Sequence, residues 1–199
     1  MTSARRFAAS VAMLAILCGA GTAQAKTVNG CVLKAKAKCS SKKLNWKLSY
    51  HGNLSGADFR KAKMRGANLR GANLKGADLR SADLTNASLT GANLKNAKLN
   101  GATLTDANFT DVSANGANLS TVSAENSNFY GSSLTKAVLS NGDFSNAGFY
   151  GADFTNANLA GSNSPPPPPP FSNETPKTTT NLINANLWGS TLSGTNLTN

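Results

Sequence analysis

The sequence predicts an all-β solenoid, a column of stacked backbone coils. Three observations predict it: a five-residue period, a large apolar residue in nearly every period, and turn-forming residues between. The period runs from residue 51 to residue 161 and contains 22 units, counted from the centre Leu54 to the centre Leu159. Nineteen centres are Leu or Phe, and 16 units carry Ala two residues before the centre.

A five-residue period fits neither an α-helix nor a flat strand. On a helix each unit advances by about 500°, so the centres scatter around the axis. On a strand an odd period sends successive centres to opposite faces. A fixed turn at every unit keeps all centres inward, and each coil then buries its apolar residues against its neighbours. The alternative, low-complexity disorder, does not require a regularly spaced Leu or Phe.

The remaining positions hold mainly Gly, Asn, Asp, Ser, Thr, Lys and Arg, and the first four are residues that favour turns. Units such as Gly66-Ala-Asn-Leu69-Arg and Gly76-Ala-Asp-Leu79-Arg follow the pattern Ala-(Asp/Asn)-Leu-x-x, which resembles the pentapeptide repeat family. The resemblance implies a right-handed quadrilateral β-helix with four units per coil. Residues 20 apart then stack.

With this stacking, Phe109, Phe129 and Phe149 are predicted to form a ladder on one side of the column. Two units depart from the pattern, because Val112-Ser-Ala114 and Val122-Ser-Ala124 exchange the large and the small partner. The exchange roughly preserves core volume. We therefore expect both valines to point inward, with a local change in the cross-section of their coil.

Residues 1–25 read as a secretory signal peptide. Arg5 and Arg6 precede an apolar run from Phe7 to Cys18, and small residues follow up to Ala25. The run is shorter than the roughly 20 residues that span a bilayer, which disfavours a membrane anchor. We expect an exported protein, periplasmic or extracellular.

Residues 26–50 are predicted to form an N-terminal cap, because a solenoid must cover its open apolar end. Leu44, Trp46, Leu48 and Tyr50 alternate with polar residues, the pattern of a half-buried strand. The repeats of residues 51–161 follow this segment.

Cys31 and Cys39 are the cysteines that remain after signal cleavage, and in an oxidising compartment they are expected to form one disulfide. Closing this small loop would stabilise the cap by about 2 kcal/mol. The alternatives are a redox pair or half of a metal site. Neither has support in the sequence, since there is no CxxC and His51 is the only histidine.

Residues 162–180 form a proline-rich insertion with six consecutive prolines from Pro165 to Pro170. Proline cannot donate to a ladder, so this segment is predicted to leave the coil as a polyproline II excursion, either a loop or a recognition segment. The repeats resume over 181–199, three residues out of phase. Trp188 follows a centre and should face outward, where it could cover the C-terminal end or contact a second copy in a homodimer.

Charge is unevenly distributed along the chain, whose formal net charge is +11. Residues 26–98 carry 16 Lys and Arg against three Asp, whereas residues 99–199 carry two Lys against six acids. A basic collar at the N-terminal end would attract an anionic partner; the alternative is a role in solubility and edge protection. The candidate surface comprises Arg60, Lys63, Arg65, Arg70, Lys75, Arg80 and Lys95.

No catalytic constellation, phosphate loop or metal-ligand spacing is present in the sequence, so we expect no enzyme, no cofactor and no small-molecule substrate. The predicted function is a non-enzymatic scaffold or binding module of the bacterial cell envelope. Its partner would be an unknown protein or an anionic envelope polymer. One alternative is a topoisomerase-binding DNA mimic, as the resemblance implies for acidic family members, but this chain is basic. The other is sequence-independent nucleic-acid binding, which export disfavours.

Overall fold

The structure, a computed structural model, describes residues 26–45, 48–160, 185–187 and 190–196. The predicted signal peptide, the proline-rich run and both Trp46 and Trp188 lie outside the described residues. Among the described residues no helix has the length and apolar character that crossing a membrane requires.

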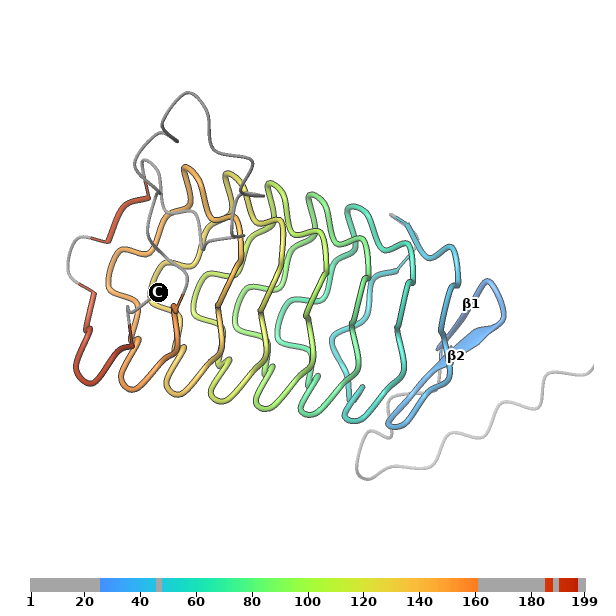
Figure 1. Ribbon diagram of the computed structural model, residues 1–199. Helices are drawn as coiled ribbons and strands as arrows, with labels where there is room; N and C mark the ends of the chain where they lie inside the picture. Colours follow the sequence, from blue (N-terminus) through green and yellow to red (C-terminus); the bar gives the residue numbers. More distant parts are fainter. Residues whose placement is uncertain (1–25, 46–47, 161–184, 188–189, 197–199) are drawn as a thin grey trace, which may run out of the picture.

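The described chain winds into a column of stacked coils (Figure 1). Neighbouring coils meet through isolated parallel bridges between residues 20 apart, for example Asp58 with Asp78 and Asp78 with Lys98. Twenty residues make four five-residue units, so each coil has four sides, as the resemblance implied. The two named strands, β1 (Lys26–Val28) and β2 (Cys31–Leu33), pair antiparallel at the N-terminal end.

Each unit turns in the same way, and the turn explains its residue preferences. The N–H of Ala72 donates to the carbonyl of Leu69 over 3.0 Å and closes the corner. Gly71 inside that corner has φ of +63°, a region in which Gly meets no steric cost. Asn68 accepts a backbone hydrogen bond from Arg70 at 3.3 Å, which stabilises the entry to the turn.

The interior of the column is filled by the centres and by the small residues two positions before them. Phe129 stacks between Phe109 and Phe149, with ring centroids 4.8 and 4.9 Å apart, so the predicted ladder is confirmed. Val112 and Val122 are 1% and 2% exposed, which confirms that both point inward. The Val-for-Ala exchange therefore keeps the core filled in both units.

Coil pairing already begins inside the segment predicted to be a cap. Lys38 pairs with Asp58, and Lys43 pairs with Lys63. Buried Cys39 takes the position of a centre, 20 residues before Phe59. The first coil therefore starts well before residue 51.

The half-buried strand expected from Leu44 to Tyr50 is absent from the described residues of this segment, 44–45 and 48–50. The N–H of Leu48 donates to the carbonyl of Leu44 over 3.0 Å, which closes a corner one residue longer than the others. Leu48 and Tyr50 then occupy the small and the central positions, and Ser49 pairs with Asn68, only 19 residues on. Leu44, Leu48 and Tyr50 lie at inward positions separated by even numbers of residues. In the sequence this spacing looks like the alternation of a strand.

The β1–β2 hairpin is joined to the first coil. Val28, Cys31 and Leu33 are buried, and Cys31 is disulfide-bonded to Cys39 with a Cα–Cα distance of 5.2 Å. The predicted disulfide is present, and it links the hairpin to a central position of the column.

The coil resumes after the proline-rich segment. Asn186 pairs with Gly148, Thr191 with Asp153 and Asn196 with Asn158. Each of these pairs is separated by 38 residues, 18 more than the usual 20, and 18 is three more than a multiple of five. The described residues on both sides of the proline-rich run therefore belong to the same ladders, although the repeats are three residues out of phase in the sequence.

Candidate binding surface at the basic end

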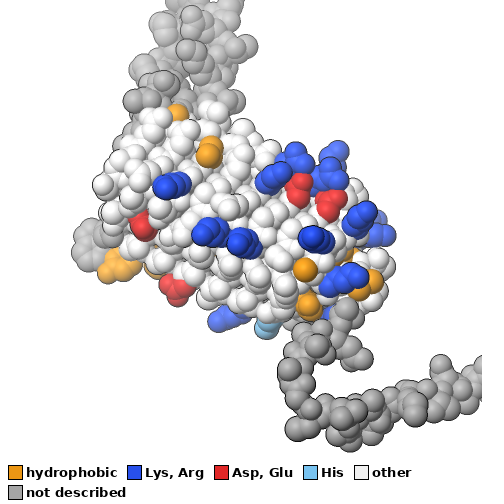
Figure 2. Space-filling model, turned by 90° about the horizontal axis from the view of Figure 1, so that it is seen from below, with side chains coloured by type: hydrophobic (Ala, Val, Ile, Leu, Met, Phe, Trp, Pro, Cys, Tyr) orange, Lys and Arg blue, Asp and Glu red, His pale blue; other side chains and the backbone are white. Residues whose placement is uncertain are grey.

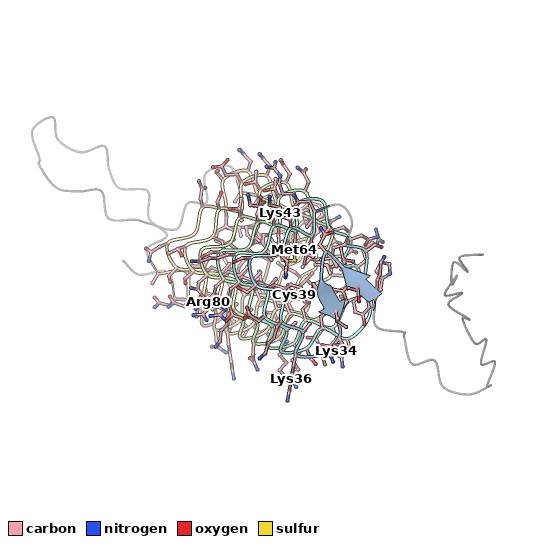
Figure 3. The ribbon with its side chains drawn as sticks, turned by 90° about the vertical axis from the view of Figure 1, so that its right-hand side faces the viewer. Lys34, Lys36, Cys39, Lys43, Met64 and Arg80 are labelled. Carbon is pink, nitrogen blue, oxygen red and sulfur yellow. A yellow bond between two sulfur atoms is a disulfide. The ribbon has the colours of Figure 1, made fainter. Side chains whose placement is uncertain are left out.

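Basic side chains gather over the N-terminal half of the column, as the face drawn in Figure 2 shows. Viewed along the axis, Lys43, Lys36 and Arg80 lie at three different parts of the rim, whereas Met64 and Cys39 lie near the centre (Figure 3). Of the seven candidate side chains, Arg80 is half-buried and the others are exposed. The stacking places them on all four sides: Arg60 with Arg80, Lys63 with Arg65, Lys75 with Lys95, and Arg70 alone.

One side of the collar is internally neutralised. Arg60 donates to both carboxylate oxygens of Asp58, at 2.9 and 2.8 Å, and Arg80 makes the same contacts with Asp78 at 2.9 and 2.7 Å. Arg60 also lies 3.8 Å from Asp78, which joins the two pairs. The two arginines offset the repulsion between carboxylates that are stacked one coil apart. We call Asp58, Arg60, Asp78 and Arg80 the paired cluster.

Hydrogen bonding from the arginines controls titration in the paired cluster. The Arg60 side chain holds the pKa of Asp58 below its ordinary value, and the Arg80 side chain does the same to Asp78, against a smaller opposing effect of burial. The pKa of each arginine is raised by its carboxylate partner. All four groups are charged at neutral pH, so the cluster has no net charge.

The other candidate cations have no ion pair within the described part of the chain. Lys63 and Arg65 lie on one side, next to Lys43 of the preceding coil, and Lys75 and Lys95 lie on the opposite side. Coil spacing of about 4.8 Å puts successive charges of one side close together. We call Lys43, Lys63, Arg65, Arg70, Lys75 and Lys95 the unpaired cations.

The candidate surface predicted from the sequence includes Arg60 and Arg80, which the structure shows to be neutralised. The signal was present, because Asp58-Phe-Arg60 and Asp78-Leu-Arg80 place acid and base two residues apart across an inward centre. Both side chains then leave the same side of the column. Lys63 is followed in its ladder by Asp83, one coil further, and no ion pair joins them.

The structure offers no metal centre among the residues it describes, where no group of three His, Cys, Asp or Glu side chains comes together. His51 is exposed. The arrangement of side chains is that of a charged surface on a rigid support. Fold and surface together define a β-solenoid with an asymmetric electrostatic field.

The family model for pentapeptide repeats matches this chain in eight copies, over residues 53–91, 87–123, 124–163 and 178–199. These matches cover more than half of the chain, and the protein belongs to the pentapeptide repeat family. Members of the family form right-handed β-helices and are generally structural or binding proteins. Among curated proteins, none matches this chain.

Several solved structures are similar to this chain. A pentapeptide repeat protein of the Arabidopsis thaliana thylakoid lumen is 31% identical, with a TM-score of 0.43, over 50% of this chain and 69% of that one. HetL, involved in heterocyst differentiation regulation in the cyanobacterium Nostoc sp. strain PCC 7120, is 26% identical, with a TM-score of 0.28, over 74% and 68%. QnrB1, a plasmid-mediated fluoroquinolone resistance protein, is 20% identical, with a TM-score of 0.43, over 80% and 72%.

Proposed function

We propose that this protein is a non-enzymatic binding module of the bacterial cell envelope whose basic end contacts an anionic partner, an envelope polymer or a protein. The observation that carries the proposal is the positive charge of residues 26–98, which contain 16 Lys and Arg but only three Asp. The secretory pattern of residues 1–25 supports export to the periplasm or the cell exterior.

The unpaired cations are the part of the collar that acts on such a partner. The paired cluster cancels its own field, whereas Lys63, Lys75 and Lys95 keep theirs. Because these side chains are exposed, their attraction is long-ranged at low salt and decays over about 8 Å at physiological ionic strength. Opposite sides of the column carry them, which suits a flexible polymer or a charged surface better than a small ligand.

Binding to phosphatidylglycerol vesicles and to wall teichoic acid, measured over a series of salt concentrations, tests this proposal. Lys75→Glu should weaken binding about tenfold at low salt, because each cation near an anionic surface contributes about 1 kcal/mol. Lys136→Glu makes the same charge change in the acidic half, one residue beyond the position that stacks with Lys75, and should have little effect. Binding that ignores salt, or equal effects of the two variants, would reject a contact through the basic end.

Location is tested separately by fractionation of cells that express the full chain from its own start. We expect the processed protein in the envelope or the medium, shorter by about 25 residues. Detection of the unprocessed chain in the cytoplasm alone would refute the envelope location. It would not affect the proposal that the basic end binds an anionic partner.

The charge distribution argues against DNA mimicry. A mimic of duplex DNA needs a row of negative charges, whereas the chain before residue 99 is basic and residues 99–199 carry only six acids. An unchanged supercoiling activity of gyrase in the presence of this protein is the expected result.

We also propose a homodimer that forms through the C-terminal end. Leu192 in the last described coil is 42% exposed, which is high for a large apolar side chain. Analytical ultracentrifugation of the chain and of Leu192→Lys tests it: a dimer that the substitution dissociates is the expected result.

A further inference from the structure

Two tyrosines form an exposed aromatic pair on the side of the column opposite the paired cluster. Tyr130 and Tyr150 are 41% and 44% exposed, and their ring centroids are 5.9 Å apart with the planes at 55°. Each directly follows a buried Phe of the core ladder, so both leave the same side in adjacent coils. The only other large apolar side chains this exposed among the described residues are Val32 and Leu192.

The ring of Tyr130 is seated in a gap that the next coil leaves for it. Gly148 occupies a ladder position that carries Ser88, Asn108 and Asn128 in the three preceding coils. A Cβ at Gly148 would collide with the ring of Tyr130. The Cε1 edge of the Tyr130 ring therefore occupies the space that a side chain at position 148 would fill. This seating favours one ring orientation before any ligand arrives, which lowers the entropic cost of binding.

Polar groups of defined type surround the pair. Asn128 accepts the backbone N–H of Tyr130 at 2.9 Å, and Asn108 accepts that of Thr110 at 2.9 Å. These bonds use the amide oxygens, so the amide NH2 groups are the donors that the side can offer to a ligand. Gly131 directly follows Tyr130, and a Cβ at Gly131 would come within 2.5 Å of Asp111 Oδ1. The Asp111 carboxylate therefore lies next to this turn and offers a hydrogen-bond acceptor.

We propose that this side binds a neutral, extended polysaccharide. Sugar rings combine an apolar C–H face with a rim of hydroxyl groups, and tyrosine offers an apolar face with a polar edge. Two rings 5.9 Å apart can stack on one sugar or on two consecutive sugars. The hydroxyl groups then bond to the amides of Asn108 and Asn128 and to Asp111.

Charge separates a polysaccharide from the other ligand that stacks on aromatic rings, a single-stranded nucleic acid. Stacking platforms for nucleic acids lie in basic grooves that follow the phosphate backbone. Residues 99–199 instead carry two Lys against six acids, and Asp111 adjoins the pair. A neutral polymer meets no repulsion there. The site is separate from the basic end and does not rest on the function proposed above.

Affinity electrophoresis of the full mature chain tests this site, in native gels that contain hydroxyethyl cellulose, glycol chitin or galactomannan. We expect retardation by at least one of these neutral polysaccharides. Tyr130→Ala and Tyr150→Ala should each weaken it about tenfold, in line with the loss of one stacked ring. Tyr130→Phe keeps the ring and should retain binding.

Two further variants separate ring placement from folding. Gly148→Ala displaces the Tyr130 ring without removing it and should weaken retardation. Ser140→Ala changes the position that corresponds to Tyr130 and Tyr150, directly after a centre, on another side of the column, and should not weaken it. Circular dichroism identifies any variant that fails to fold. Retardation by none of the three polymers, or equal retardation of the parent and both alanine variants, overturns the proposal. So does a dimer that Tyr130→Ala dissociates in the absence of any glycan binding, because the pair is then an interface.

Discussion

The two halves of the column share one interior and differ in everything they present outward. Before residue 99 the outward positions carry cations, and after it they carry Ser, Thr, Asn, acids and two exposed tyrosines. The inward positions follow the same rule in both halves, with Leu or Phe at most centres and a small partner two residues before, apart from Met64 and the two Val-x-Ala units. A five-residue unit therefore separates stability from recognition almost completely, because two positions build the core and three face solvent.

The largest expected effect comes from the shared interior. Phe129→Ala removes the middle ring of the Phe ladder and leaves a cavity, so it should lower the free energy of unfolding by about 3–5 kcal/mol. Leu79→Ala in the basic half should cost about 2–5 kcal/mol by the same mechanism. Urea unfolding followed by circular dichroism measures both. A loss below about 1 kcal/mol in either variant would show that the halves do not share one kind of core.

The next effect concerns the N-terminal end. Replacing Cys31 and Cys39 together by Ala should lower the free energy of unfolding by about 2 kcal/mol, because the closed loop is short. The loss should be local, since the disulfide links the β1–β2 hairpin to the first coil only. Hydrogen exchange should therefore accelerate in residues 26–45 and remain unchanged around Phe129. Uniform acceleration along the column would contradict a local role.

The smallest effect belongs to the paired cluster and depends on pH. The pKa of Asp58 and of Asp78 is lowered in the folded state by hydrogen bonds from Arg60 and Arg80. A lowered carboxyl pKa stabilises the fold above the unfolded value of about 3.9, and this contribution is lost as pH falls through the folded value. The double variant Asp58→Asn, Asp78→Asn should thus lose less thermal stability than the parent on acidification below about pH 4.

The expected difference is small, because the Arg60 and Arg80 side chains remain 49% and 42% exposed and water screens the pairs. The same double variant offers a second measurement. Asn can keep the turn hydrogen bond while Arg60 and Arg80 become free, so binding to phosphatidylglycerol vesicles should strengthen at low salt. Unchanged binding would show that this side of the collar does not face the anionic partner.

Sequence reasoning succeeded where one unit is enough to specify the answer. The period itself indicates the coil. The unit Val112-Ser-Ala114 is readable because a larger residue at the small position and a smaller one at the centre roughly preserve the combined volume of the two side chains. It failed where the period is interrupted. One extra residue between Leu44 and Leu48 hides the first coil, although Ala37 and Cys39 already stand at inward positions.

The candidate surface was predictable only in part for a similar reason. The sequence places cations outward, but their net effect depends on which acids share a side with them. Asp58 and Asp78 stand two residues before an arginine and on the same side, and this relation follows from the turn geometry. The aromatic pair likewise depends on Gly148, which is 18 residues from Tyr130 and reads as an ordinary small residue.

By itself the sequence determined that this chain winds into coils, which residues it buries and where its charge lies. The reason is that a chain with a five-residue apolar period buries every centre when it turns by a fixed angle at every unit. Only the tertiary structure decided which cations remain unpaired, where the first coil begins and how the tyrosine rings lie. Those features arise from contacts between neighbouring coils, about 20 residues apart in the chain, and a single unit does not contain them.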